Sequence, residues 1–365
     1  MSETEEMYFN DFIKLNRGFD LPESKIAAGK YPIAASTSIK DYHNAFKVKA
    51  PCVTTGRSGS LGTVLYINEN CWPLNTALYV KDYKGNFPKY VYYFLQTMKL
   101  ESFNCGAGVP TLNQNHLHKI KIKVHRKEEQ AIVASILSTY DELIENNNRR
   151  IAILEQTAEQ IYKEWFVRIR FPGYENTEFE KGVPKDWEIT YLRNFIKLNR
   201  GFDLPDEKII AGNYPVIAST SIKAYHHQYK VEAPCITTGR SGSLGTVQYV
   251  NAKSWPLNTS LYVKDFKGNS PIYVYYFLKS IKLENFNSGA GVPTLNQNHL
   301  QTLKFGLPSK TVQNKFEEII SPIFKQIEIH KEQNQNLKQT RDLLLPRLIS
   351  GKLKAKEAEK EIETV

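Results

Sequence analysis

The chain has 365 residues, of which 41% are hydrophobic and 12% aromatic, enough for two domains with cores of their own. No apolar run approaches the roughly 18 residues of a membrane span, and the acidic start, residues 1–6, has no apolar signal segment, so we expect a cytoplasmic protein. The formal net charge of +10 favours a polyanionic partner such as nucleic acid.

The first 126 residues predict a mixed α+β domain. Segments rich in β-forming residues and bounded by proline or glycine predict strands; these are residues 7–11, 31–37, 52–55, 63–68, 77–80 and 120–124. The aromatic and apolar stretch at residues 89–99 predicts a helix packed on the sheet, and residues 106–110 must form a loop.

A long helix is predicted over residues 127–166. Its apolar positions alternate in steps of four and three for about five heptads, which is the pattern of a coiled-coil seam. These positions are Val133, Leu137, Tyr140, Ile144, Asn147, Ile151, Leu154, Ala158, Ile161 and Trp165. A single long helix lying across a sheet is the alternative.

The whole pattern then repeats. Residues 12–20 reappear letter for letter as residues 195–203, an offset of 183, and roughly three-quarters of positions 12–120 are identical to their counterparts. In the second helix identity falls but the pattern survives. Its seam positions are Phe316, Ile320, Ile323, Ile327, His330, Asn334, Leu337, Arg341, Leu344 and Leu348.

The length of the linker predicts how the two helices pair. About 20–25 residues join the first helix to the second domain, and a parallel pairing would stretch them to nearly their full length. We therefore expect an antiparallel pair, with polar seam residues such as Asn147 and Asn334 fixing the register. Pro322 should kink the second helix, and Pro346 should kink or end it.

One glycine-rich loop, Gly-Arg-Ser-Gly-Ser-Leu-Gly at residues 56–62, recurs at residues 239–245. Its glycines let backbone N–H groups approach an anion closely, its serines can donate to phosphate, and its arginine can pair with phosphate or guanine. The alternative is a tight structural turn with an exposed arginine. The spacing fits neither a P-loop nor a dinucleotide fingerprint.

Two further polar runs occur in both copies. Residues 106–116 end in Thr-Leu-Asn-Gln-Asn-His, and asparagine and glutamine read adenine by bidentate hydrogen bonds, although Asn113 is equally well placed as a helix N-cap. Residues 36–43, Ser-Thr-Ser-Ile-Lys-Asp-Tyr-His, suit phosphate and groove contacts, with an ordinary solvated loop as the alternative.

The sequence offers little support for an enzyme or a metal site. The histidines have no cysteine or aspartate at ligand spacing, and no catalytic triad, Walker, zincin or adenine-methyltransferase motif is present. Of the four cysteines only Cys52 and Cys235 are equivalent, so we expect reduced thiols rather than structural disulfides. A stand-alone nuclease or methyltransferase with a cryptic site remains the alternative function.

The end of each helix carries a further motif, and together these resemble the specificity subunit of type I restriction–modification systems. Residues 163–168, Lys-Glu-Trp-Phe-Val-Arg, followed by Phe-Pro-Gly at 171–173, resemble the family's central conserved region. Residues 341–352, Arg-Asp-Leu-Leu-Leu-Pro-Arg-Leu-Ile-Ser-Gly-Lys, resemble its distal one. The two loop motifs resemble recurrent parts of its target recognition domains.

This resemblance implies an architecture of two similar α+β target recognition domains separated by two long helices, which form an antiparallel intramolecular coiled coil with pseudo-twofold symmetry. The predicted segments are the first recognition domain (1–126), the central helix (127–168), a linker (169–190), the second recognition domain (191–309), the distal helix (310–353) and a charged tail (354–365).

The resemblance also implies a non-catalytic reader of a bipartite site in double-stranded DNA. Two modification subunits would dock on the helices, and restriction–translocase subunits would join them. No cofactor is expected in this chain, whereas S-adenosylmethionine, ATP and magnesium are expected in the partners. Because the two readers are nearly identical, we expect a near-palindromic target. The predicted DNA-binding residues are Lys40, His43, Thr55, Arg57, Ser58, Ser60, Asn113, Gln114 and Asn115, with Lys223, His226, Thr238, Arg240, Ser241, Ser243, Asn296, Gln297 and Asn298 in the second copy.

Overall fold

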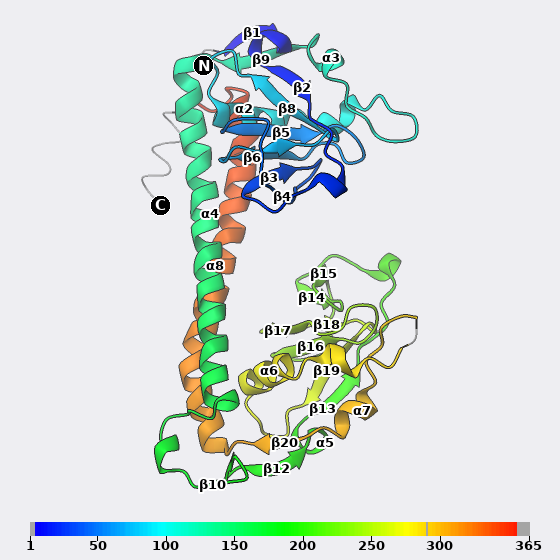
Figure 1. The fold of residues 1–365 in the computed structure, drawn as a ribbon, viewed down its shortest axis with the longest axis vertical. Helices are drawn as coiled ribbons and strands as arrows, with labels where there is room; N and C mark the ends of the chain where they lie inside the picture. The colour runs from blue at the N-terminus through cyan, green and yellow to red at the C-terminus, as the bar shows by residue number, and fades with distance from the viewer. Residues whose placement is uncertain (1–3, 290, 356–365) are drawn as a thin grey trace. The chain divides into compact units, whose positions relative to one another are not determined.

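The computed structural model describes residues 4–289 and 291–355, and its chain divides into two units (Figure 1). Unit 1 consists of Met1–Asn148 and Lys331–Val365, and unit 2 of Arg149–His330. Each unit therefore combines one copy of the repeated domain with a part of both long helices. Most of the predicted charged tail, from residue 356 onward, lies outside the described residues.

Unit 1 contains the first copy of the domain. Its elements are β1 (Thr4–Tyr8), α1 (Phe9–Phe12), β2 (Lys14–Arg17), β3 (Tyr31–Ala34), β4 (Ile39–His43), β5 (Cys52–Gly56), β6 (Val64–Ile67), β7 (Trp72–Pro73), β8 (Ala77–Asp82), α2 (Pro88–Thr97), α3 (Gln114–Leu117) and β9 (Lys121–His125). An antiparallel sheet has the order β2-β8-β5-β6, a smaller one the order β4-β3-β7, and β1 pairs with β9.

Unit 2 repeats this plan. Its elements are β10 (Phe179–Glu180), β11 (Val183–Pro184), β12 (Glu188–Tyr191), α5 (Leu192–Phe195), β13 (Lys197–Arg200), β14 (Tyr214–Ile217), β15 (Ile222–His226), β16 (Cys235–Gly239), β17 (Val247–Val250), β18 (Trp255–Pro256), β19 (Ser260–Asp265), α6 (Pro271–Ser280), α7 (Gln297–Gln301) and β20 (Lys304–Leu307). The sheets have the orders β13-β19-β16-β17, β15-β14-β18 and β12-β20, with β10 and β11 as an added hairpin.

The core of each unit forms where the larger sheet meets its aromatic helix. In unit 1, α2 contributes the fully buried Tyr90 and Tyr93, which pack with Phe12 and Val53 in one apolar cluster. Pro88 is the first residue of α2, where its missing N–H costs nothing because that group has no partner inside the helix. All the strands and the helix predicted from residue 31 to residue 124 are confirmed as elements, with bounds that differ by a few residues.

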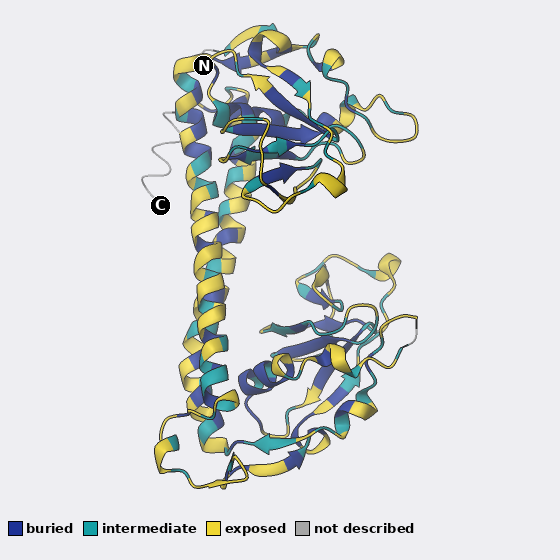
Figure 2. Ribbon diagram, in the orientation of Figure 1, coloured by how far each residue is buried: buried dark blue, intermediate teal, exposed yellow. Residues whose placement is uncertain are grey.

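The two long helices are α4 (Lys127–Tyr162), which continues as a π-helix over Lys163–Val167, and α8 (Lys310–Ile349). Every seam position predicted from the heptads is buried or half-buried (Figure 2), so the predicted seam is confirmed. The alternative of a helix lying alone across a sheet is wrong, since each helix packs against the other within both units.

The helices run antiparallel in each unit. In unit 1, Asp141 pairs with Arg341 at 2.5 Å and Asn147 with Asn334 at 3.0 Å, so the partner's number falls as the residue number rises. In unit 2, the rings of Trp165 and Phe316 lie 5.7 Å apart, which continues the same series. The predicted antiparallel pairing is therefore confirmed.

Some local predictions need correction. The segment 7–11, predicted as a strand, is extended only as far as Tyr8, and Phe9–Phe12 form the helix α1. The helix α8 continues through both Pro322 and Pro346, so Pro346 does not end it. Residues 39–43 form strand β4 rather than a loop, and residues 14–17 form strand β2, which we did not predict.

Among the described residues, no helix has the length and apolar content needed to cross a bilayer.

Candidate nucleic-acid interface

The two motif loops of each domain are joined by backbone hydrogen bonds. In unit 1, the Gly59 N–H donates to the Pro110 carbonyl at 2.9 Å, and the Leu112 N–H donates to the Arg57 carbonyl at 2.8 Å. Loops that lie about 50 residues apart in the sequence thus form one composite surface. Unit 2 repeats both bonds, from Gly242 to Pro293 and from Leu295 to Arg240, with the same lengths.

A half-buried serine supports this composite surface through its hydroxyl group. The Ser36 hydroxyl is 3.0 Å from the Ser58 carbonyl and 2.9 Å from the Thr76 carbonyl, and Ser219 makes the equivalent contacts in unit 2. Gly56 permits this packing, since a Cβ there would lie 2.0 Å from the Ser60 carbonyl oxygen. The glycine-rich loop is therefore a tight structural turn with a half-exposed arginine. Its contact with nucleic acid stays a prediction.

The composite surface of unit 1 is hollowed. A depression of about 260 Å³ is lined by Arg17, Arg57, Leu78, Cys105, Thr111, Leu112, Asn113, Gln114 and Asn115. The Arg57 guanidinium is anchored by a 3.2 Å bond to the Asn75 carbonyl, which leaves its other N–H groups available to a ligand. Two guanidinium groups and three amides in one hollow match the donors and acceptors that read base edges and phosphates.

Gln114 gives this hollow an unsatisfied hydrogen-bonding atom. Its Oε1 is buried and has no hydrogen-bond partner in the described chain, although buried polar atoms are normally paired. A donor supplied by a ligand, such as the amino group of a base, would satisfy it.

Asn113 caps helix α3, because its Oδ1 accepts the Asn115 N–H at 2.9 Å. Asn296 does the same for Asn298 at 2.9 Å in unit 2. The N-cap alternative is therefore confirmed for this side chain. Capping occupies the oxygen and holds the exposed Asn115 and Asn298 at the start of the short helix.

The other predicted contact residues fall into two groups. The solvent-accessible ones, exposed or half-exposed, are Lys40, Arg57, Ser58, Ser60, Gln114 and Asn115 with Lys223, Arg240, Ser241, Ser243, Gln297 and Asn298. Lys40 and Lys223 form exposed ion pairs with Glu23 at 2.6 Å and Asp206 at 2.5 Å. Such pairs contribute little stability, so either lysine can exchange its partner for a phosphate at small cost.

Four predicted contact residues are buried instead, which corrects the prediction for them. His43 and His226 are 6% and 3% exposed, and each accepts a backbone N–H at 3.1 Å through Nδ1 and packs edge-on against a tryptophan ring. Thr55 and Thr238 are 1% exposed because they lie in β5 and β16, between two neighbouring strands of the larger sheet. These side chains support the surface from inside.

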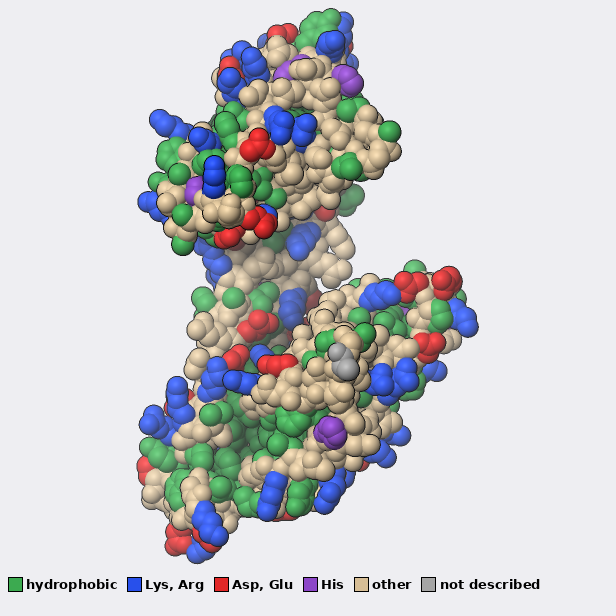
Figure 3. Space-filling view, turned by 45° about the vertical axis from the view of Figure 1, so that its right-hand side comes forward, with side chains coloured by type: hydrophobic (Ala, Val, Ile, Leu, Met, Phe, Trp, Pro, Cys, Tyr) green, Lys and Arg blue, Asp and Glu red, His purple; other side chains and the backbone are tan. Residues whose placement is uncertain are grey.

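Sequence reasoning missed Arg17 and its counterpart Arg200. Arg17 lines the hollow, and its guanidinium lies 3.5 Å from the Asp20 carboxylate, with both side chains largely exposed. The available signal was the run Asn-Arg-Gly-Phe-Asp, which is identical in both copies. Figure 3 shows lysine and arginine spread over the visible face of each unit with acidic side chains among them, rather than gathered in one uniform basic patch.

No group of three histidine, cysteine, aspartate or glutamate side chains that could hold a metal ion occurs among residues 4–289 and 291–355.

The family model for the type I restriction modification DNA specificity domain matches residues 1–156 and again residues 184–339. The chain belongs to this family.

Two similar proteins of this family come from Methanocaldococcus jannaschii. The type I restriction enzyme MjaIX specificity subunit is 26% identical over 307 residues, covering 75% of this chain and 71% of that protein. A putative MjaX specificity subunit is 24% identical over 307 residues, covering 74% and 69%. Family membership assigns a non-catalytic specificity role and gives no support to the alternative of a stand-alone nuclease or methyltransferase.

A solved structure shows the same fold. The S subunit of a type I restriction-modification system from M. genitalium superposes with a TM-score of 0.65 at 19% identity, covering 95% of this chain and 96% of that chain. At this identity the likeness establishes the arrangement of elements alone. It agrees with two mixed domains and two long paired helices as the fold class predicted from the sequence.

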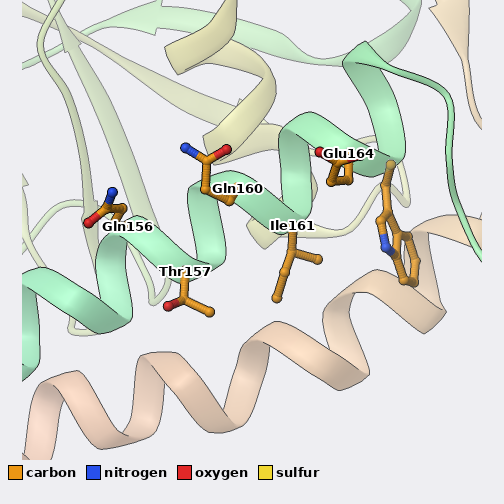
Figure 4. Close-up of a pocket in the computed structure, with 6 residues that line it drawn as sticks. Gln156, Thr157, Gln160, Ile161 and Glu164 are labelled. Carbon is orange, nitrogen blue, oxygen red and sulfur yellow. The ribbon is translucent and has the colours of Figure 1, made fainter.

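A second surface of this specificity-subunit chain lies on α4 in unit 2. A hollow of about 470 Å³ is lined by Gln156, Thr157, Gln160, Ile161, Glu164 and Trp165 (Figure 4). Ile153, one turn before Thr157 on the same helix face, is 63% exposed, and Val167 is 59% exposed. Large apolar side chains exposed beside a hollow are typical of a protein-binding surface.

Proposed function

We propose that this chain is the DNA-reading subunit of a type I restriction–modification complex and that each unit reads one half of a bipartite site. The observation that carries this proposal is the composite surface. Two motifs, identical in both copies, join into a surface that in unit 1 contains a hollow lined by Arg17, Arg57 and an unsatisfied Gln114. Neighbouring subunits would then methylate adenine and cleave.

The near-identity of the two surfaces supports a specific target. Residues 56–62 and 106–117 are identical to residues 239–245 and 289–300, so both units present the same groups to a base pair. Because the two helices pair antiparallel, we propose that the two readers meet the duplex in opposite orientations and that the half-sites are inverted copies of one sequence.

Mapping of methylated adenines in the host genome tests this proposal directly. We expect two inverted, matching half-sites separated by a fixed gap. Two unrelated half-sites would contradict the proposed near-palindrome while leaving the role as a reader intact. No motif that depends on this chain would contradict the role itself.

The arginines provide a second test. Arg57→Ala and Arg240→Ala should each cost about 1–3 kcal/mol of specific binding and relax the choice of base in one half-site, if the guanidinium reads a base edge. Lys185→Ala is a control, because Lys185 is an exposed cation outside the two motif loops that pairs with Glu178 at 2.8 Å. Equal weakening on all sequences would assign the arginines to phosphates instead.

For the partners, we propose that modification subunits dock on the helices and use the hollow on α4 with the neighbouring Ile153. Supporting this, three of the residues that line the hollow, Gln156, Thr157 and Gln160, are exposed side chains on one helix face. We further propose that S-adenosylmethionine, ATP and magnesium are held by those partners and that the complex is cytoplasmic.

Charge placed on this helix face tests the docking proposal. Gln160→Arg should weaken co-purification with the modification subunit encoded beside this chain and leave the fold unchanged, because the side chain is exposed. Ser135→Arg is the control, since Ser135 is exposed on the same helix about six turns before Gln156 and does not line the hollow. Equal capture by both variants would place the docking surface elsewhere.

A further inference from the structure

The loop at residues 106–110 ends in a tip with only apolar side chains. Its sequence is Gly-Ala-Gly-Val-Pro, and Val109 is 58% exposed. The matching tip of unit 2 presents Val292, which is 59% exposed. A large apolar side chain exposed at the same place in both units, beside the arginine loop, has no role in either core.

Hydrogen bonds within the loop hold its two ends together. The Asn104 Oδ1 accepts the N–H groups of Gly106 at 2.9 Å and Thr111 at 2.8 Å, and the Thr111 hydroxyl donates to the Val109 carbonyl at 2.9 Å. Asn287 and Thr294 make the same three bonds in unit 2, at 2.9, 2.9 and 3.0 Å. These bonds restrict the backbone on either side of the valine, which lowers the conformational entropy that the loop would lose on binding a partner.

The two glycines of the tip differ in whether the packing of the chain itself requires a residue without a side chain. At Gly106 a Cβ would lie 2.0 Å from the Val109 carbonyl oxygen, so the loop's own fold demands glycine. At Gly108 and Gly291 a Cβ would meet nothing within 4 Å, and neither residue has a left-handed backbone. Glycine without an internal reason is typical of a backbone that a ligand approaches closely.

We infer that Val109 and Val292 contact the 5-methyl group of thymine in the major groove, one in each half-site. This inference rests on the proposed DNA-reading function and adds a specific contact to it. The tip carries no polar side chain, so its side chains can discriminate only by apolar contact. The thymine methyl is the one apolar group that a base pair displays in the major groove, whereas minor-groove edges display none. Gly108 and Gly291 then let the backbone lie against the same base pair.

The inference is tested with DNA that lacks these methyl groups. The full chain first selects its binding site from a random duplex library, and each thymine of that site is then replaced by deoxyuridine. We expect one replacement in each half-site to weaken binding about fourfold, the effect of removing one buried methyl group. Val109→Ala should weaken binding to the thymine-containing half-site by a similar factor, with no further loss on its deoxyuridine form.

Two further variants keep the test decisive. Gly108→Ala should leave thermal unfolding unchanged and weaken binding to the selected site, because the added methyl group faces open space within this chain and the duplex in the complex. Val109→Thr, which keeps the branched shape and one methyl group, should lose less than Val109→Ala.

The two proposals fail in different ways. Equal affinity for the thymine and deoxyuridine forms of the selected site would overturn the inference, and so would a selected site without thymine. Equal affinity is also the result expected if the valine inserts between stacked bases instead of contacting the methyl group. In each case the DNA-reading role stands. Failure to select any sequence overturns the DNA-reading role itself.

Discussion

The two units are alike where they present loops and different where the helices meet the domain. The backbone hydrogen bonds that join the two motif loops have the same lengths in both units. At the helix junction of unit 1, the Tyr93 hydroxyl donates to Asp141 at 2.6 Å, and Asp141 pairs with Arg341. The equivalent positions in unit 2 are Tyr276, Phe324 and Ala158, an aromatic contact with no ion pair.

The motif loops and the helix junctions therefore have different structural requirements. Identical loops suit a pair of readers that recognise the same feature. The helix junctions need only fill space and match their own partner, so they can diverge.

The largest effect is expected from a substitution that disrupts the aromatic packing at the helix junction of unit 2. Phe316 is fully buried and lies against the rings of Tyr162, Trp165 and Tyr276. Phe316→Ala should cost about 3–5 kcal/mol, since it leaves a cavity among rigid rings. Its counterpart Val133→Ala in unit 1 should cost about 2 kcal/mol, because less apolar surface is lost. Hydrogen exchange measured separately on peptides of each unit checks both values, and equal losses would contradict the comparison.

The second-largest effect is expected when the residues of the unit 2 helix junction replace their counterparts in unit 1. Asp141→Phe and Arg341→Ala should each cost about 1–3 kcal/mol, because each removes one partner of an ion pair that is only about a quarter exposed. The double variant recreates the Phe324 and Ala158 arrangement and should recover to within about 1 kcal/mol of the parent. A double-mutant cycle by urea unfolding measures the coupling, and additive losses would show that the junctions are not interchangeable.

A smaller effect concerns the amide cluster in the helix seam of unit 1. Asn334 accepts from Asn147 at 3.0 Å and donates to Asn148 at 2.9 Å, and the first contact is buried. Asn334→Ala should cost about 1–2 kcal/mol because it leaves buried amide groups without partners. The control Asn336→Ala, at an exposed position two residues on, should change the melting temperature little. Similar shifts for the two variants would remove the cluster as a stabilising feature.

The smallest effect is a pH dependence confined to unit 1. Burial first, and the Lys14 charge second, lower the pKa of His118 below its ordinary 6.5, and the ring Nε2 accepts the Leu15 N–H at 3.1 Å. The folded-state pKa is depressed, so the neutral His118 ring contributes stability that is present above pH 6.5. That stability is lost as the pH falls through the folded-state pKa. Gln301 occupies the equivalent place in unit 2.

His118→Gln should therefore flatten the loss of stability of unit 1 between about pH 7 and pH 5. Denaturant midpoints of the two units at both values measure this, with unit 2 as the internal control. An unchanged slope in unit 1 would assign its acid sensitivity to other groups.

The amino-acid sequence by itself determined the repeat, the alternation of the heptad seam and the two loop motifs. It also determined the antiparallel pairing, through the length of the linker. These properties are local or periodic, so each can be read from residues near one another in the chain. The family resemblance rests on the same kind of short motif, at residues 163–173 and 341–352.

Only the tertiary structure decided which polar residues face outward. His43 and Thr55 read as contacts in the sequence but are buried by strands that come from elsewhere in the chain, and Arg17 enters the hollow with Arg57 because β2 and β5 flank the same strand β8. The unsatisfied oxygen of Gln114 is likewise invisible until its neighbours are in place. Burial and convergence depend on contacts between segments many residues apart, and no local pattern encodes them.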